Sequence, residues 1–546
     1  MSGAGVPAAS SLTASAQQPA PTLTTHPWVG IAAVLCGAFI STVTGRLSSF
    51  GLADIRGGVG AGFDEGAWIT TASGCAQMLV GPLAVWLAVV FGPRRVLEVS
   101  CPAFAIASLL LPLSPDLPTL LTFQALAGLA SGTFVPLTIS FVLRNLEPRY
   151  WAYGIAAYAL NLELSLNISA SLEGWYIDHL SWRWIFWQSV PLAVLMALFV
   201  HRGIPKGPVD WPLLRRADWF GMASLSLGLA MVYAAIDQGN RLDWLGSGLV
   251  VGLLAGGGLL VLAFVVHERR TPQPWINLGL ILRYPIPLVM GLLVTLRLAI
   301  LSTALLVPQF LIAVRGLRTE DVGPALLAIA LPQLVIAPLT GILLRRVDAR
   351  LGIAAGFATV GLACLLVSQG LTRDWVPATF LPTQGLQAVG QTLAMSSMIF
   401  LNVQHLRPAE ALSFGVILQT ARLFGGVLGA AGMATWLRVR EQVASQLIGL
   451  NVEAGDLLTQ GRLHAYAAAV SPQSIGPAQA NARAVGLLSS AVRKEANIQA
   501  YIDGFLAVAI IMLLALVLAA LLRPPPVGPA SPRPLRQSGR QSPNTD

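Results

Sequence analysis

The stretch WVGIAAVLCGAFISTVTGRLSSF, residues Trp28–Phe50, sets the pattern for the whole chain: it is a long apolar run with a single charged side chain, Arg46. A helix needs about 20 predominantly apolar residues to cross the hydrocarbon core of a bilayer. Similar runs recur as far as Leu522, with short charged joints between them. Helices of soluble domains are shorter and keep a polar face. The pattern therefore predicts an all-α membrane protein that crosses the bilayer many times.

About fourteen crossings of suitable length can be marked in this way. They are Trp28–Phe50, Glu65–Phe91, Arg95–Leu113, Leu117–Leu143, Trp151–Ile177, Trp182–Phe199, Trp219–Ile236, Leu245–Val266, Ile286–Ile312, Val322–Leu344, Leu351–Leu371, Val376–Leu401, Ala409–Leu437 and Ile502–Leu522. The joint Arg438–Tyr501 is far longer than the others and contains two polar, helix-like stretches, Glu441–Leu450 and Ala480–Asn497.

Composition and charge agree with a membrane protein. The chain has 546 residues, of which 55% are hydrophobic and only 11% are charged, against about 25% charged in typical soluble domains. Its net charge of +9 comes from basic residues at helix ends and in the C-terminal tail. Alternate joints are richer in arginine, which the positive-inside rule explains better than nucleic-acid binding does. With an even helix count, the rule places both termini in the cytoplasm and the long joint outside it.

Other classes of site find no support. The four cysteines lie inside apolar runs without CxxC spacing, which argues against a metal site or a disulfide framework. The sequence contains no HExxH, GxSxG or phosphate-loop motif, so a membrane enzyme is disfavoured.

Ionisable residues inside a crossing are the strongest functional signals, because each costs about 2.5–3.5 kcal/mol on insertion scales and usually faces a partner or a cavity. They are Arg46, Glu163, Glu173, Arg297 and Arg422. With a rise of about 1.5 Å per residue, Glu163, Arg297 and Arg422 all fall near the middle of the bilayer. Glu163 with Arg297 or Arg422, and Arg46 with Glu173, are therefore possible pairs.

Glu163 is the strongest single candidate. It belongs to a stripe of polar residues at alternate positions, Asn161, Glu163, Ser165 and Asn167. A carboxyl group there is consistent with proton coupling or with a structural ion pair, and the sequence leaves both open. The same two readings, cavity contact or helix–helix hydrogen bond, apply to the neutral residues Gln124, Gln384, Gln387 and Gln391. Small residues such as Gly425, Gly426 and Gly429 predict close helix packing.

Several motifs together carry a family resemblance. They are Glu65-Gly-Ala-Trp68-Ile-Thr-Thr71, Phe91-Gly92-Pro-Arg94-Arg95, Ser181-Trp-Arg-Trp-Ile-Phe186 followed by Val190-Pro191, Leu306-Val-Pro-Gln-Phe-Leu311, Gln384-Gly385 and Thr420-Ala-Arg-Leu-Phe-Gly-Gly426. The chain resembles the fourteen-helix drug:proton antiporter branch of the major facilitator superfamily, and within it the EmrB-type multidrug exporters. The resemblance covers nearly all of Val29–Leu522.

The resemblance implies the domain organisation. The expected units are a disordered cytoplasmic tail (1–27), a six-helix bundle (28–203), two inserted helices (204–270), a second six-helix bundle (271–522, including a long extracytoplasmic loop, 437–501) and a second disordered tail (523–546). The fold would be that of a transporter of the inner (plasma) membrane. A substrate site near the midplane would open alternately to each side.

The resemblance also implies roles for individual residues. Proton coupling would fall to Glu163 and Arg46. The residues expected to bind substrate are Arg46, Gln124, Asn161, Asn167, Arg297, Gln384, Gln387 and Gln391. Those expected to serve packing or conformational change are Gly92, Arg94, Arg95, Arg422, Gly425 and Gly426. The family usually has an acidic residue in place of Thr44 and an arginine in place of Gln124. Arg46 and Glu163 would then be a rebuilt version of its acidic–arginine arrangement.

The expected function is export of small organic molecules or drugs by proton antiport. The surplus of arginines suggests anionic or weak-acid substrates. No cofactor is expected, since the proton gradient supplies the energy. Expected partners are the substrate, the lipid bilayer and, as the resemblance allows, a periplasmic adaptor and an outer-membrane channel. Two alternatives stay open: an uptake or uniport carrier of the same fold, and a non-transporting sensor or assembly subunit.

Overall fold

The computed structural model describes residues 27–271, 274–276, 278–406, 410–453, 455–474 and 476–523, and the regular elements of these residues are all helices. The first half of the chain contains α1 (Pro27–Phe50), α2 (Leu52–Val59), α3 (Phe63–Gly66), α4 (Trp68–Val90), α5 (Pro93–Leu110), α6 (Leu117–Ser131), α7 (Phe134–Asn145), α8 (Trp151–His179), α9 (Trp184–Trp187) and α10 (Ser189–Gly203). The two predicted tails lie almost wholly outside the described residues.

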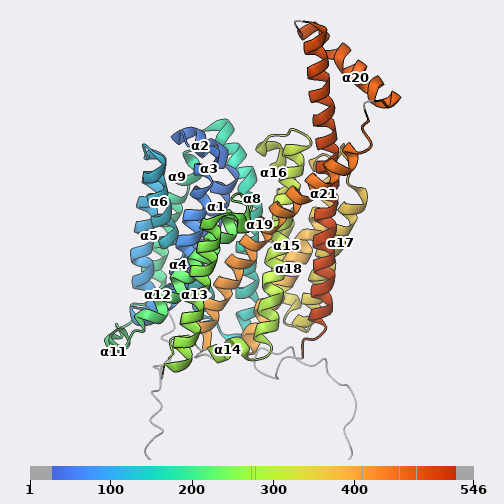
Figure 1. Ribbon diagram of the computed structural model, residues 1–546. Helices are drawn as coiled ribbons and strands as arrows, with labels where there is room; N and C mark the ends of the chain where they lie inside the picture. Colours follow the sequence, from blue (N-terminus) through green and yellow to red (C-terminus); the bar gives the residue numbers. More distant parts are fainter. Residues whose placement is uncertain are drawn as a thin grey trace, which may run out of the picture.

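The remaining helices complete the bundle that Figure 1 shows. After α11 (Trp211–Arg215) come α12 (Trp219–Gly239) and α13 (Gly248–Arg270), and then α14 (Leu278–Leu282), α15 (Ile286–Ala313), α16 (Thr319–Leu343), α17 (Ala349–Gly370), α18 (Pro377–Gln404), α19 (Ala411–Gly449), α20 (Leu457–Val470) and α21 (Pro477–Ala519).

Within the described part of the chain, 12 helical segments are long and apolar enough to cross a membrane. The fourteen predicted crossings correspond to these segments plus α8 and α18, which have 29 and 28 residues. The last two are long enough to cross but more polar. Both are largely covered by protein: α8 packs against α1, α16 and α18, and α18 packs against α16 and α17. Their polar side chains therefore face other helices instead of lipid.

One predicted crossing, Leu117–Leu143, is interrupted. It consists of α6 and α7, and a short turn at Gly132 and Thr133 separates the two helices. The Thr133 hydroxyl donates to the carbonyl oxygen of Ala130 at 2.8 Å. Pro136 has no N–H to continue the ladder of helical hydrogen bonds. The two pieces still form one apolar segment of 27 residues.

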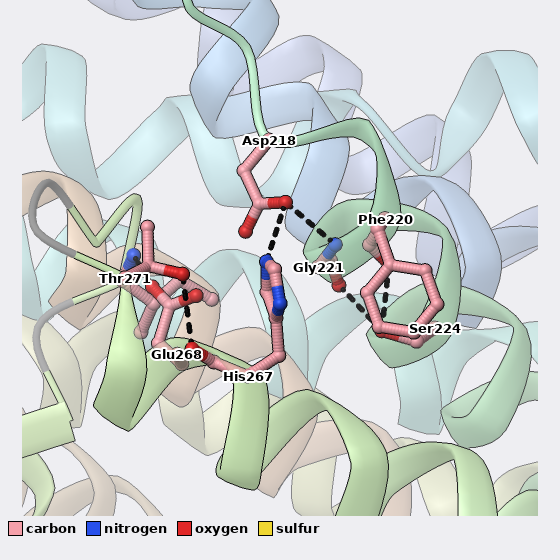
Figure 2. Close-up of polar contacts among 8 residues, drawn as sticks. Asp218, Phe220, Gly221, Ser224, His267, Glu268 and Thr271 are labelled. Atoms are coloured by element: carbon pink, nitrogen blue, oxygen red, sulfur yellow. Dashed lines mark hydrogen bonds and ion pairs between the residues drawn. The ribbon is translucent and has the colours of Figure 1, made fainter.

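A polar contact joins the two inserted helices where α12 begins and α13 ends. The Asp218 carboxylate accepts a hydrogen bond from the backbone N–H of Gly221 at 2.9 Å, which caps α12. The same oxygen lies 2.9 Å from Nε2 of His267 on α13, as Figure 2 shows. Farther along the pair, Gly228 and Gly257 face each other so closely that a Cβ atom on Gly257 would lie 2.8 Å from the Gly228 carbonyl oxygen. The pair is therefore a tight helical hairpin.

The long joint before the last crossing is largely helical. The two polar stretches predicted within it are continuous with the crossing helices α19 and α21, which have 39 and 43 residues. At about 1.5 Å per residue these helices are roughly 58 and 64 Å long, against about 30 Å for a hydrocarbon core. Their outer parts project beyond the bundle together with α20 (Figure 1). Arg440 of α19 pairs there with Asp503 of α21.

The apolar core continues across the two halves of the chain. The largest buried apolar cluster combines α8 residues, among them Tyr158 and Leu162, with residues of α15, α17, α18, α19 and α21. A second cluster holds together α1, α5, α6, α7 and α10. Helix α8 thus contacts both sets of helices, which places its polar stripe at the centre of the molecule.

Glycines bring α19 close to α15, as the small-residue pattern predicts. A Cβ atom on Gly425 would lie 2.8 Å from the Val294 carbonyl oxygen, and one on Gly429 would lie 2.4 Å from the Leu298 carbonyl oxygen. Any larger side chain at these positions would push the helices apart. This contact sets the distance between Arg297 on α15 and Arg422 on α19.

We predict that Gly429→Ala destabilises the protein by about 1–3 kcal/mol, the usual cost of overpacking a tight contact. The measurement is the apparent Tm of the purified protein in detergent. Gly432→Ala on the same helix is the matched control, because a Cβ there has no neighbour within 4 Å, and alanine favours a helix by about 0.5–1 kcal/mol over glycine. Equal Tm values for the two variants would contradict the close contact.

Candidate functional site

A polar cavity of about 210 Å³ lies between the two halves of the chain. Its wall is formed by α1, α4, α6, α8, α12, α15 and α19, with the lining residues Ser41, Thr42, Gly45, Arg46, Ser48, Ser49, Thr70, Ser73, Gly74, Gln77, Gln124, Leu166, Tyr233, Asp237, Arg297, Leu301, Arg422, Leu423, Gly426, Val427 and Ala430. The last turns of α1 and α12 and the first turn of α4 contribute to it. The cavity thus extends from mid-depth toward the end of the bundle at which α20 projects (Figure 1).

A larger hollow of about 760 Å³ lies between α4, α5 and α6. Its lining is apolar apart from Arg95, Ser100 and Thr133. At membrane depth an apolar groove of this kind is filled by acyl chains, whereas the smaller cavity offers the charged and hydrogen-bonding groups that recognise a solute. The polar cavity is therefore the candidate site.

Three arginines define the cavity, and they come from three helices: Arg46 from α1, Arg297 from α15 and Arg422 from α19. Arg297 and Arg422 are each about 5% exposed. The guanidinium carbon of Arg46 lies 4.9 Å from the centre of the Phe50 ring, which is a cation–π distance. The structure thus brings together the three cations that the sequence singled out, including Arg422, for which a conformational role is expected.

Glu163 and Arg297 form an ion pair at the centre of the molecule. Oε1 of Glu163 lies 3.2 Å from Nη1 of Arg297, and the two side chains are 1% and 6% exposed. This is one of the two alternatives predicted for Glu163. Among the described residues, the second carboxylate oxygen of Glu163 and Nε of Arg297 have no hydrogen-bond partner. The pair is thus tightly enclosed, but part of its hydrogen-bonding capacity is unused.

Arg422 has a neutral partner instead. Its Nε donates to Oε1 of Gln419, one turn earlier on α19, at 3.0 Å. It forms no ion pair with any described carboxylate, and this leaves its positive charge directed toward the cavity that it lines.

Arg46 and Glu173 do not form the pair that their depths allow. Glu173 is buried beside Gly51, which follows the last residue of α1. A Cβ atom added to Gly51 would lie 3.3 Å from Oε1 of Glu173. Within the described residues, its other oxygen and Nε of Arg46 lack hydrogen-bond partners. Arg46 lines the cavity and Glu173 does not.

The neutral residues expected to bind substrate divide into two groups. Gln124 lines the cavity. Asn161 and Asn167 instead donate to backbone oxygens, Asn161 to Leu35 on α1 at 3.0 Å and Asn167 to Glu163 at 2.8 Å. Asn161 therefore links α8 to α1, whereas the hydrogen bond of Asn167 stays within α8.

The glutamines of α18 also lie outside the cavity lining. Nε2 of Gln391 donates to Oε1 of Gln387 at 3.1 Å, and Nε2 of Gln387 reaches Sγ of Cys364 on α17 at 3.3 Å. Gln384 is 4% exposed and likewise does not line the cavity. Helix α18 was expected to form part of the wall, but α4, α12 and α19 do so in its place.

Two ionisable residues of the cavity lining were not among the predicted site residues, namely Tyr233 and Asp237 of α12. The predicted crossing ended at Ile236, one residue before the aspartate, whereas α12 continues to Gly239. Oδ2 of Asp237 accepts a hydrogen bond from the Thr71 hydroxyl on α4 at 2.5 Å. A search for acidic residues within one turn of each predicted crossing would have found Asp237.

The residues of the loop between α4 and α5 lie far from the cavity. Gly92 has a left-handed backbone (φ 84°) at the start of α5, a conformation that favours glycine. Arg94 pairs with Glu98 at 2.8 Å and donates to the Ile204 carbonyl oxygen beyond α10 at 3.1 Å. Arg95 donates to the carbonyl oxygen of Phe91 at 3.2 Å. These contacts tie the α4–α5 turn to the end of α10.

Comparison with known proteins shows the family to which this architecture belongs. The Major Facilitator Superfamily profile matches residues 34–430. The probable multidrug resistance protein EmrY of Escherichia coli K12 is 26% identical over 446 residues, which cover 79% of this chain and 84% of the relative. The fatty acid resistance protein FarB of Neisseria gonorrhoeae is 22% identical over 500 residues, 91% of this chain and 96% of the relative.

A solved structure agrees on the fold. The crystal structure of the human organic anion transporter MFSD10 (TETRAN) superposes with a TM-score of 0.55 at 14% identity, covering 90% of this chain and 99% of that chain. The charged central cavity, the multi-pass helical bundle and the profile match lead to one conclusion: the chain is a multi-pass membrane protein of the Major Facilitator Superfamily, a family of transporters and not of enzymes.

Proposed function

We propose that this protein exports small organic molecules across the inner membrane by alternating access, with the proton gradient as its energy source. The observation that carries the proposal is the polar cavity at mid-depth, lined by Arg46, Arg297 and Arg422. Relatives named for multidrug export and resistance support export as the direction. The surplus of arginines supports an organic anion or weak acid as the substrate.

The same proposal extends to orientation and partners. Arginine-rich alternate joints support cytoplasmic termini. The projecting part of α19, α20 and α21 would then lie outside the cytoplasm. The resemblance to EmrB-type exporters supports a periplasmic adaptor and an outer-membrane channel as partners.

Within the site, we assign substrate contact to the three arginines and Gln124, and proton coupling to Glu163. A proton that binds Glu163 removes the charge that holds Arg297, and a substrate anion that binds Arg297 removes the partner of Glu163. Substrate and proton therefore act on the same ion pair. The glutamines of α18 would reach substrate only if rocking of the two halves exposed them.

Transport by purified full-length protein in proteoliposomes tests the proposal. A panel of organic acids and lipophilic drugs is offered with and without an imposed pH gradient, and counterflow is measured in parallel. We expect the gradient to drive accumulation of at least one organic acid. Counterflow that ignores the pH gradient would indicate a uniporter, and a complete lack of transport would favour a sensor or assembly subunit.

We predict that Arg422→Gln weakens binding of a transported organic anion about tenfold, because a hydrogen bond to a charged group is worth about 1.5–3 kcal/mol. Binding is measured by equilibrium titration. Arg438→Ala, at a half-exposed position farther along the same helix, is the control and should bind as the wild type does. Wild-type affinity in Arg422→Gln would argue against an anion site.

We predict that Glu163→Gln changes the number of protons exchanged on substrate binding by about one, since a glutamine at this position cannot titrate. A pH indicator in weakly buffered solution reports this number. Loss of one partner from a buried pair costs about 3–5 kcal/mol, so the double variant Glu163→Gln/Arg297→Gln serves as a folded control. A proton count equal to that of the wild type would remove Glu163 from coupling.

A further inference from the structure

One wall of the cavity carries the opposite charge from the rest. Helix α12, from the pair inserted between the two predicted bundles, contributes Tyr233 and Asp237, whereas α1, α15 and α19 contribute arginines. The inserted pair is therefore part of the site itself. With Glu163 counted as the partner of Arg297, three arginines against two carboxylates leave the cavity with a single net positive charge.

A chain of hydrogen bonds fixes Asp237 in place. Nη1 of Arg241 pairs with Asp64 at 3.1 Å, and its Nε donates to Oε1 of Gln238 at 2.7 Å. Nε2 of Gln238 in turn donates to the Thr71 hydroxyl at 2.5 Å, which leaves the hydroxyl proton to be donated to Oδ2 of Asp237 at 2.5 Å. The hydroxyl of Thr71 thus acts as the donor to Asp237, and the carboxylate is held as an acceptor.

Asp237 nevertheless lacks a cationic partner. Among the described residues, no lysine, arginine or histidine forms an ion pair with it, and the one side-chain hydrogen bond to its carboxylate comes from the hydroxyl of Thr71. A carboxylate taken out of water is costly unless a cation or several donors satisfy it. Asp237 lines the same cavity as Arg422, which likewise has no carboxylate partner among the described residues.

We propose that the cavity binds an amphoteric organic molecule, whose anionic group contacts the arginines and whose protonated amine contacts Asp237. The inference rests on the proposed function and narrows its substrate class. A purely anionic ligand would be repelled by Asp237, and a purely cationic one by the arginines. The volume of about 210 Å³ lies below the roughly 300–1,000 Å³ of pockets for drug-sized ligands, which favours a small molecule.

Three probes with one carbon skeleton test the assignment: phenylalanine (zwitterion), 3-phenylpropionate (anion) and 2-phenylethylammonium (cation). Binding to full-length protein in nanodiscs is measured for each probe. We expect the wild type to bind phenylalanine about tenfold more tightly than either of the others, since a charge-assisted hydrogen bond contributes about 1.5–3 kcal/mol.

Asp237→Asn should weaken phenylalanine binding about tenfold and strengthen 3-phenylpropionate binding, because it removes a charge that attracts the amine and repels the anion. Asp237→Glu keeps the charge and should retain the preference for phenylalanine. Asp243→Asn is the matched control: this residue lies just beyond α12, its side chain is 81% exposed, and the variant should behave as the wild type does.

Several results would overturn the assignment. They are a wild type that binds phenylalanine no more tightly than 3-phenylpropionate, or that binds neither, and an Asp237→Asn variant that keeps the wild-type preference. If Asp237→Asn does not fold, the wild-type ratio alone decides. Failure of the proposed function is seen separately, as an absence of pH-driven transport across the acid and drug panel.

Discussion

The ion pair between Glu163 and Arg297 is the contact on which the rest of the structure depends. Either charge alone at mid-depth would cost several kilocalories per mole, so the fold must let the side chains of Glu163 on α8 and Arg297 on α15 reach each other. The pair is 3.2 Å apart and almost fully enclosed. Since α8 belongs to the first half of the chain and α15 to the second, the pair also links the two halves, which pack against each other mainly through α8 and α16.

The requirement to shield polar groups explains which helices are central. Helices α8 and α18 are the long helices that fall short of the hydropathy of a crossing, and α16 lies against both of them. Apolar helices such as α13 can face lipid on most of their surface, whereas a helix that carries Glu163 or Gln391 must be surrounded by protein. Low hydropathy in a helix of crossing length is therefore a sign of a central position in this fold.

The sequence predicts well how deep a residue lies in the bilayer, but poorly in which direction its side chain points. Apolar run length and arginine placement were enough to mark the crossings and to put Glu163 level with Arg297, because rise per residue is nearly constant. Which way a side chain points depends on the rotation of each helix, and that is set by tertiary packing. For this reason the glutamines of α18 were assigned to the cavity although they pair with each other and with α17.

Asp237 was missed for a different reason. A polar residue at the end of a helix looks like the start of a loop, so the predicted crossing stopped at Ile236. In the structure α12 continues to Gly239, and the side chains of Asp237 and Gln238 hydrogen-bond with Thr71 on α4 instead of facing a loop. The predicted crossings at the long joint also stop short, at Leu437 and Ile502, whereas the helix-like stretches predicted beyond them are continuous with α19 and α21.

In the two proposals, Glu163 and Asp237 would couple the binding of a solute to the binding of a proton in opposite directions. An anion that binds Arg297 would leave Glu163 without its cationic partner. Because a buried carboxylate without a partner tends to bind a proton, anion binding and proton binding would favour each other at this pair. An amine at Asp237 instead competes with a proton for the same carboxylate, and this linkage moves them in opposite directions. If both proposals hold, the cationic group of the substrate would exchange for a proton at Asp237, beside the proton coupling that we propose for Glu163. In this chain the inserted helix α12 supplies the one carboxylate, Asp237, among the described residues that line the cavity.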